Sequence, residues 1–464
     1  MSARTGRVFG AVLAVLLLTG AAEPESRLEQ YFRLRGEAAK AVQTGDLAGA
    51  EAKFETALAL YPTSPGSLIR LARVEVAAGK PQEAVAHLAV YADLGLTWDV
   101  AGDAALKTLV DRPDFAPVAA RLSHNTKPIG SIEVVATLAD PRFIGEGVEV
   151  PFSNSGEARW LVSGVAGRAI LDVSDPDRIR PFLPASEGTG SLFGMKFDSG
   201  PDVIWVSEAW GEGLPGGSGA RRTGLLKLSS IDGKILGRFP LPDDGKPHQL
   251  GDVVVGDIPI GGNEAPVYAS DSVGGGLYQL PPGARALSPL VTSREIASPQ
   301  GMAMCRTGSA LVVADYPTGL HRVDLKSGAV IAIEGGDRFA LAGIDGLVWN
   351  SNVDARRIES GLPPPPLELI ATQNGVTPQR VLAIQLSPDC RGIISVTVLA
   401  ANLPEMEDLS LGAIEEEAYF FVGRSQWAGW DADGKPLPGD PGPVRLLKLR
   451  FPRTEEPSHD RPHP

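Results

Sequence analysis

The chain has 464 residues, of which 43% are hydrophobic and 21% charged, and its formal net charge at pH 7 is -13. This length is enough for two domains, or for one domain with an appendage. An acidic chain without a run of Lys and Arg is a poor match for nucleic acid or an anionic membrane, because neutralisation of phosphates supplies most of that affinity. The 54 glycines and 39 prolines favour many tight turns, so we expect a β-rich body.

The first residues have the layout of a secretory signal peptide. Two arginines precede an apolar run from Val8 to Leu18, and small residues follow through Ala22. The run is too short to span a bilayer. No cysteine follows it, which disfavours a lipid anchor. We therefore predict that 1–22 is a signal peptide and that the protein is periplasmic or secreted, with no membrane span.

Residues 23–125 are predicted to form a helical domain. Their apolar residues recur at helical spacing, and the turns at Gly45 and Gly79 lie 34 residues apart, which is the tetratricopeptide period. The stretch 98–122 would cap the stack, and a generic helical hairpin is the alternative. The residues that carry the tetratricopeptide resemblance are Ala38, Ala50, Phe54, Ala57 and Pro62, and one period later Leu71, Ala72, Ala84 and Leu88.

From about residue 130, short Val, Ile and Leu runs separated by Gly, Asp and Pro replace the helical spacing. Residues 298–335 form the clearest unit, an antiparallel meander of four short strands. Similar units recur about fifty residues apart, six in all, which predicts a six-bladed β-propeller over 130–452. Two long loops are predicted to extend from the propeller, at 211–222 and 350–366, and a disordered tail is predicted at 453–464.

The two cysteines, Cys305 and Cys390, fall in predicted hairpin turns of different repeats. An exported protein could oxidise them to a disulfide. Their spacing does not show that they meet, so a disulfide and two free thiols both remain open. No Cys or His spacing indicates a zinc site.

Asp345 stands at the head of the apolar run "GIDGLVW", which is predicted to be the innermost strand of the fifth blade. Innermost strands line the central channel, so its carboxylate would lie beside the equivalent residues Glu146, Asp252 and Gln300. Converging carboxylates repel one another unless a cation lies among them, and all-oxygen ligation suits Ca²⁺ or Mg²⁺. The alternative is that each is a solvated or capping turn residue.

The motifs "IGEGVEV", "SPQGMAMCRTGSALVVAD" and "GIDGLVW" resemble leading strands of the senescence marker protein/gluconolactonase/luciferin-regenerating family of six-bladed propellers. The resemblance implies a divalent metal, most readily Ca²⁺, held by Glu146, Gln300 and Asp345. Gln300 replaces the family's Asn and is one methylene longer. The resemblance also implies that the metal polarises an ester carbonyl while Asp345 serves as catalytic base.

The third blade departs from the family pattern. Where the family has an Arg and an Asn for substrate before an Asp, this chain has Gln249, Gly251 and Asp252. The Arg that would bind a sugar acid is missing, so that specificity is not implied. Gln249, Asp252 and His248, which precedes them at the channel mouth, are the candidate substrate-binding residues.

Two further motifs place amides and an indole at strand ends: "TQNG" at 372–375 and "SQW" at 425–427. They would either line the pocket or stabilise the edges of the sheets. The sequence thus leaves three functional hypotheses. The first is a metal-dependent hydrolase of lactone-like or related ester substrates. The second is a non-catalytic propeller that binds a small molecule or a protein, with the helical repeats as docking platform. The third is another propeller enzyme, such as an isomerase or lyase.

Overall fold

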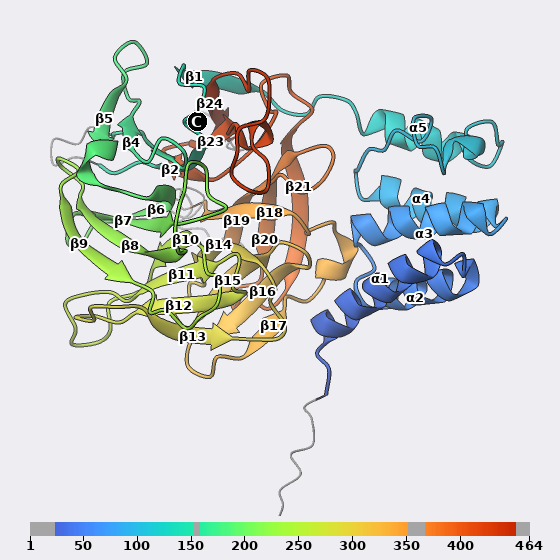
Figure 1. The fold of residues 1–464 in the computed structure, drawn as a ribbon, viewed down its shortest axis with the longest axis horizontal. Helices are drawn as coiled ribbons and strands as arrows, with labels where there is room; N and C mark the ends of the chain where they lie inside the picture. Colours follow the sequence, from blue (N-terminus) through green and yellow to red (C-terminus); the bar gives the residue numbers. More distant parts are fainter. Residues whose placement is uncertain (1–23, 153–157, 351–366, 452–464) are drawn as a thin grey trace, which may run out of the picture.

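The structure is a computed structural model, and it describes residues 24–152, 158–350 and 367–451. The helical domain lies beside a ring of six sheets, next to the sheet that contains β21 (Figure 1). The fold class predicted from the sequence, a six-bladed β-propeller behind a helical repeat domain, is confirmed. The predicted signal peptide 1–22, the tail 453–464 and nearly all of the loop 350–366 lie outside the described residues.

The helical domain consists of two helical hairpins and a capping segment. Its helices are α1 (Arg27–Gln43), α2 (Leu47–Leu60), α3 (Pro65–Ala77), α4 (Pro81–Asp93), the short η1 (Lys107–Leu109) and α5 (Ala116–His124). Ser26 and Glu29 form a capping box at the start of α1, and Pro65 and Pro81 occupy the first turns of α3 and α4. Gly45 and Gly79 end the first helix of each hairpin with positive φ.

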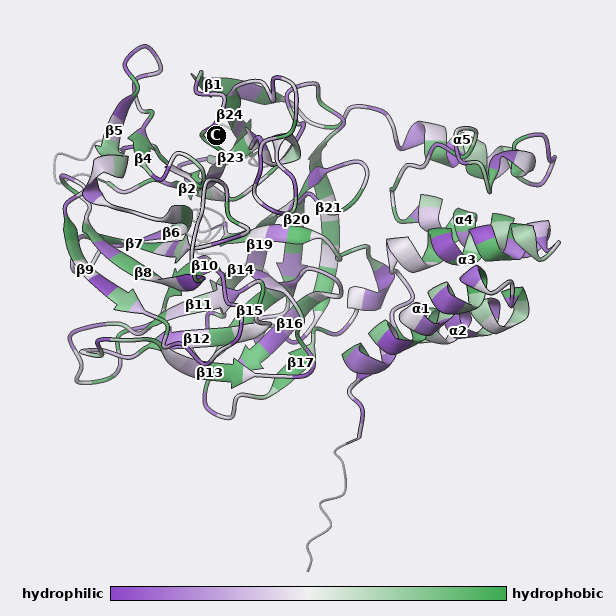
Figure 2. Cartoon of the chain, viewed as in Figure 1, coloured by the Kyte–Doolittle hydropathy of each residue, from purple (hydrophilic) through white to green (hydrophobic). Residues whose placement is uncertain are grey.

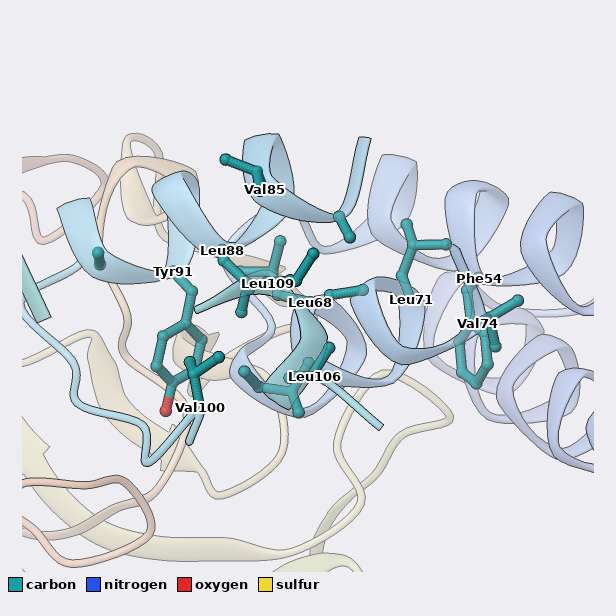
Figure 3. Packing of buried hydrophobic residues seen from close by; sticks show 14 of the residues in the cluster. Phe54, Leu68, Leu71, Val74, Val85, Leu88, Tyr91, Val100, Leu106 and Leu109 are labelled. Atoms are coloured by element: carbon teal, nitrogen blue, oxygen red, sulfur yellow. The ribbon is translucent and has the colours of Figure 1, made fainter. Parts of the chain in front are cut away.

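Small residues allow the helices to approach closely, as the repeat pattern predicts. Ala38, Ala50 and Ala72 are fully buried. Figure 2 shows hydrophilic and hydrophobic residues side by side on α1 and α3, as expected for helices that bury one face. In Figure 3, Leu106 and Leu109 lie with the side chains of α3 and α4, so the segment after α4 does cap the stack.

In the described residues, the strands form six antiparallel four-stranded sheets, and the first strand of each contacts its counterparts in the neighbouring sheets. The unit at 298–335 is confirmed as the fourth sheet. In ring order, and from the channel outward, the strands are β2 (Gly145–Glu149), β3 (Leu161–Gly164), β4 (Ile170–Asp172), β5 (Arg180–Leu183); β6 (Ser191–Asp198), β7 (Val203–Trp210), β8 (Arg222–Ser229), β9 (Ile235–Pro240); β10 (Leu250–Val255), β11 (Val267–Asp271), β12 (Gly276–Leu280), β13 (Ser288–Thr292); β14 (Pro299–Met304), β15 (Ala310–Asp315), β16 (Gly319–Asp324), β17 (Val330–Ala332); β18 (Ile344–Trp349), β19 (Leu367–Gln373), β20 (Arg380–Leu386), β21 (Ile393–Ala401); and β22 (Gly412–Glu415), β23 (Ala418–Arg424), β24 (Val444–Arg450), β1 (Ile132–Leu138).

The sixth sheet closes the ring with a strand from the other end of the domain. Its order is β1-β24-β23-β22, so the outermost strand β1 precedes the first blade in the sequence. Val134 pairs with Leu447, and Leu138 pairs with Val444. Backbone hydrogen bonds between the two ends of the propeller therefore hold the ring shut.

Glycines let the inner strands approach closely around the channel. An added Cβ at Gly147 would lie 2.7 Å from the carbonyl oxygen of Phe193, on the next blade. At Gly301 it would lie 2.5 Å from the backbone nitrogen of Leu347. A side chain at either position would push neighbouring blades apart, so glycine at these positions keeps the channel narrow.

Cys305 and Cys390 form a disulfide, with a Cα–Cα distance of 6.2 Å. Cys305 follows β14, and Cys390 lies in the turn between β20 and β21. The bond therefore joins the fourth and fifth blades, and it settles the alternative that the sequence left open.

Candidate functional site

The site residues lie where the inner strands begin, at the end of the channel that we call the channel mouth. Each of β2, β10, β14 and β18 has an irregular register at its head. The irregular residues include Glu146, Asp252, Gln300 and Asp345. A β-bulge turns a side chain away from the regular alternation of the strand, which explains how polar residues come to stand at the heads of apolar strands.

The structure brings together Glu146, Asp252 and Asp345, which we call the channel carboxyls. The charge of Asp345 raises the pKa of Glu146, and the charge of Asp252 raises the pKa of Asp345, each after a larger effect of burial. Burial is thus the main cause of the shifts, which raise the pKa of Glu146 to about 8, of Asp345 to about 7 and of Asp252 to about 6. No salt bridge joins them to a basic side chain within the described part of the chain, and the charge of Lys196, which is paired with Glu149, lowers the pKa of Asp252 against the larger effect of burial.

Glu146 is held by an indole. Trp427, in the short helix η4 (Trp427–Gly429), donates its Nε1 hydrogen to Oε2 of Glu146 at 2.6 Å. The indole packs against the cluster that contains Leu214, from the predicted long loop 211–222, together with Phe193. This loop therefore supports one wall of the channel mouth.

Asp345 is held by an amide. Asn374 donates Nδ2 to Oδ2 of Asp345 at 2.8 Å and to the carbonyl of Leu409 at 2.8 Å. Tyr316 donates its hydroxyl to Oδ1 of Asn374 at 2.9 Å, which fixes the orientation of the amide. Asp345 is therefore held in a position set by three blades.

Asp252 and Gln300 lie on adjacent inner strands. Asp252 Oδ2 accepts a hydrogen bond from the backbone nitrogen of Met302 at 3.0 Å. Gln300 donates Nε2 to the hydroxyl of Ser298 at 3.0 Å. Its Oε1 lies 3.8 Å from the position that a Cβ at Gly251 would take, and the hydroxyls of Ser272 and Ser270 lie 3.8 and 3.9 Å from the same point. The absence of a side chain at position 251 thus leaves a space bordered by oxygens.

The sequence reasoning missed Ser410 and Asp408, which precede β22. Ser410 is fully buried, and its hydroxyl lies beside Glu146 and Asp345. Hydrogen bonding from this hydroxyl lowers the pKa of both carboxyls, against the larger effect of burial, while the charge of Asp408 raises both. Neither residue belongs to a recognisable strand motif.

His248 and Gln249 both contact Asp271 on the third blade. The two ring nitrogens of His248 face Asp271 Oδ2 at 2.5 Å and Asp244 Oδ1 at 2.9 Å. The backbone nitrogen of Gln249 donates to Asp271 Oδ1 at 2.9 Å. The structure therefore places the His248 ring between two carboxylates on the third blade, and its predicted role in substrate binding stays a prediction.

Both interpretations of the two strand-end motifs are realised. Asn374 and Trp427 line the site, as described above. Gln373, by contrast, donates Nε2 to the carbonyls of Ala340 and Ala342, each at 2.7 Å. Gln426 accepts from the backbone nitrogen of Ile144 at 3.0 Å. These two amides stabilise loops at the edges of the sheets.

The donor set fits a hard cation only if neutral oxygens contribute. Among the residues that the structure describes, no three His, Cys, Asp or Glu side chains lie close enough together to hold an ion alone. Glu146 and Asp345 supply two carboxylates, and the hydroxyl of Ser410 lies beside both. Gln300 adds an amide oxygen from the fourth blade, which is next to the blade of Asp345. Such a mixture of carboxylate and neutral oxygens is the ligand type that Ca²⁺ takes.

Comparison with known protein families identifies the helical repeats. Residues 41–94 match the tetratricopeptide repeat family, which confirms the repeats predicted in the helical domain. No curated protein sequence matches the chain. Similar solved structures include a gluconolactonase from Xanthomonas campestris, with 13% identity, a TM-score of 0.42 and coverage of 70% of this chain and 95% of that one. Another is the PQQ-bound aldose sugar dehydrogenase from Streptomyces coelicolor, with 14% identity, a TM-score of 0.42 and coverage of 70% and 99%.

The described residues contain no helix that is long and apolar enough to cross a membrane.

Proposed function

We propose that the propeller binds a divalent cation, Ca²⁺ most readily, at the channel mouth and hydrolyses a lactone-like or related ester there. The observation that carries this proposal is the set of three buried channel carboxyls with raised pKa values, which lie beside the buried hydroxyl of Ser410 and have no salt bridge to a basic side chain among the described residues. Buried charges of one sign need a counter-charge, and a cation with open coordination positions would supply it.

The roles of the residues follow from their contacts. Glu146, Asp345 and Gln300 would hold the cation, and Ser410 lies where it could add an oxygen. The cation would polarise the ester carbonyl. Asp345 is oriented by Asn374 and would serve as the base that takes a proton from water. The space left by Gly251, bordered by hydroxyls and an amide, would receive the polar part of the substrate.

The test is calorimetric titration with Ca²⁺ of the wild-type protein and of Asp345→Asn. The substitution keeps the shape and removes one charge, and carboxylate count sets affinity in such sites, so we expect affinity to fall tenfold or more. The EDTA-treated variant should be as stable as wild type, or more stable, because one repelling carboxylate is gone. If Asp345 only capped a turn, Ca²⁺ binding would be unaltered and the variant would lose about 1 kcal/mol of stability.

We also propose export to the periplasm or beyond, as the signal-like N-terminus predicts. The disulfide between Cys305 and Cys390 supports this proposal, since such bonds persist in oxidising compartments. Protein recovered from the periplasm of an expressing bacterium should begin near Glu23 by N-terminal sequencing. Soluble cytoplasmic protein that retains Met1 would contradict it.

A second candidate function, docking of a protein partner, is favoured by a groove on the helical domain. This cavity of about 1250 Å³ is lined by Trp98, Phe115, Leu122 and Arg73, and by Thr377 of the propeller. Trp98 and Arg73 are half-buried in this groove, and Trp and Arg are residue types that dominate the energetics of protein interfaces. Trp98→Ala should abolish capture of any partner that copurifies with the full chain. Undiminished capture would exclude the groove.

A further inference from the structure

One short loop connects the helical domain to the channel site. The loop 374–379, between β19 and β20, touches the helical domain on its outer side and the candidate ligands on its inner side. It contains Gly375, whose Cα would lie 2.5 Å from a Cβ at Gly343, so the loop is pressed against the segment that leads into Asp345.

On the outer side, the loop shares a core with the helices. Val376, 8% exposed, and Ala340 belong to the same buried hydrophobic cluster as Leu88 and Leu96 of the helical domain. The backbone nitrogen of Thr97 donates to the carbonyl of Thr377 at 2.8 Å. Loops of this kind are ordinarily among the more mobile parts of a protein, so these contacts restrict a segment that the propeller alone would leave freer.

Arg380 ties the end of the loop to the helical domain and to the strand head. It is 4% exposed and donates to Gln373 Oε1 at 2.6 Å, to the carbonyl of Ala340 at 3.2 Å and to the carbonyl of Leu94 at 3.1 Å. No salt bridge joins it to a carboxylate in the part of the chain that the structure describes, and burial lowers its pKa to about 10. A buried guanidinium held only by neutral acceptors is costly to remove from water, and it keeps its place only if all of those acceptors stay in position.

On the inner side, the same loop holds two blades of the site. Asn374 bonds to Asp345 Oδ2 and to the carbonyl of Leu409. The side chain of Gln379 accepts a hydrogen bond from the backbone nitrogen of Leu409 at 2.8 Å. Leu409 lies between Asp408 and Ser410, so both ends of the loop position the segment that carries the hydroxyl of Ser410.

We propose that the helical domain is a positioning element of the channel site, acting through the loop 374–379 and Arg380. Contact with the helices holds the loop, and the loop in turn holds Asp345 and the segment around Ser410 in the arrangement that binds the cation. Arg380 is a positioning residue, since it touches none of the candidate ligands. The metal-binding part of this inference rests on the proposed function, and the positioning part stands on the contacts alone.

The test compares Arg380→Met with Asn402→Gly, both in the full-length mature chain. Arg380→Met removes all three hydrogen bonds at similar side-chain length. Asn402 makes a different contact between the domains, donating Nδ2 to the carbonyls of Asn125 at 2.9 Å and Lys127 at 3.1 Å, and it has a positive φ of 56° that glycine tolerates. Asn402→Gly therefore weakens the contact between the domains without touching the loop.

Two readouts are needed: amide hydrogen exchange of Leu409 in EDTA-treated protein, and the dissociation constant for Ca²⁺ alone. We expect Arg380→Met to speed the exchange of Leu409 by tenfold or more and to weaken Ca²⁺ binding by at least fivefold, with Asn402→Gly within twofold of wild type in both. Equal effects of the two variants, or no effect of Arg380→Met on Leu409, would overturn the proposal.

If Arg380→Met does not fold, Val376→Ala replaces it, because it trims the loop contact by two methyl groups and leaves the hydrogen bonds intact. We then expect a smaller effect in the same direction, about threefold on Leu409 exchange, and no effect would overturn the proposal. If wild-type protein binds no Ca²⁺, the proposed function fails, and the exchange of Leu409 in metal-free protein still decides whether the helical domain positions the site.

Discussion

Two of the channel carboxyls accept a hydrogen bond from the N–H group of another side chain: Glu146 from Trp427, and Asp345 from Asn374. These donors favour the charged form, yet burial outweighs them, so both pKa values stay raised. The metal-free site therefore prefers to keep protons that ordinary carboxyl groups would lose. A cation competes with those protons for the same oxygens.

This preference predicts that the stability of the metal-free protein falls as pH rises, which is opposite to the usual effect of carboxylates. When the pKa of a carboxyl group is higher in the folded than in the unfolded chain, the folded state binds more protons between the two values. The stability of the EDTA-treated protein should thus fall as pH rises from about 4, the ordinary value, through the raised values of about 6 for Asp252, about 7 for Asp345 and about 8 for Glu146. Thermal melting between pH 5 and 9 measures this.

The matched control is Asp345→Asn, in which the decline should be shallower because one titrating group is gone. Added Ca²⁺ should raise the melting temperature of wild type more at pH 8 than at pH 5. A melting temperature of metal-free wild type that stays level from pH 5 to 8 would contradict the prediction.

Single residues also show which parts of the candidate site could be predicted from the sequence. Asp345 and Glu146 were predictable because a polar residue before an apolar run marks the start of an inner strand. Asn374 and Trp427 stood in motifs that were noted, and their partners became evident only in three dimensions. Ser410 and Asp408 lie in irregular chain before the short β22, where no periodicity indicates which way a side chain points.

At the scale of elements, the packing of the inner strands depends on backbone contact between blades. Gly301 of β14 faces β18, where an added Cβ would lie 2.5 Å from the nitrogen of Leu347 and 2.7 Å from the carbonyl oxygen of Asp345. We therefore expect Gly301→Ala to destabilise the protein by about 1–3 kcal/mol, the usual cost of overpacking. Denaturant unfolding measures the change.

Gly36 provides the matched control for this substitution. It lies within α1, and an added Cβ would meet nothing within 4 Å. Gly36→Ala should therefore raise stability by about 0.5–1 kcal/mol, because alanine is the better helix former. If both variants lost stability equally, the close approach of β14 and β18 would not be the cause.

Strand content and blade number were predictable at this scale, and the pairing of β1 was not. Short apolar runs separated by Gly and Pro identify strands locally. The partner of β1 is β24, about three hundred residues further along the chain, and strand periodicity carries no information about such distant pairing. The disulfide between blades four and five is unpredictable for the same reason.

At the scale of the whole molecule, the sequence predicted two domains as separate units, and the structure shows them joined by a buried contact. Arg380 and Val376 read as ordinary strand and loop residues, because their burial comes from the helical domain. A repeat period identifies each domain but does not show which face of one meets the other.

That contact makes a reciprocal prediction. If the helical domain helps to position the cation site, thermodynamic linkage requires that a bound cation strengthen the contact between the domains. The reporter is the amide of Thr97, which donates to the carbonyl of Thr377 in the loop 374–379. Saturating Ca²⁺ should slow its hydrogen exchange several-fold, measured by mass spectrometry or NMR.

The control for this measurement is the amide of Ile129, which donates to the carbonyl of Ala401 at 2.9 Å. This bond also joins the chain before the propeller to the fifth sheet, but it does not pass through the loop 374–379. The exchange rate of this amide with Ca²⁺ should stay within twofold of its rate without Ca²⁺. Equal slowing at both amides would indicate a general gain in stability, and an unchanged rate at Thr97 in protein that does bind Ca²⁺ would mean that the helical domain and the channel act independently.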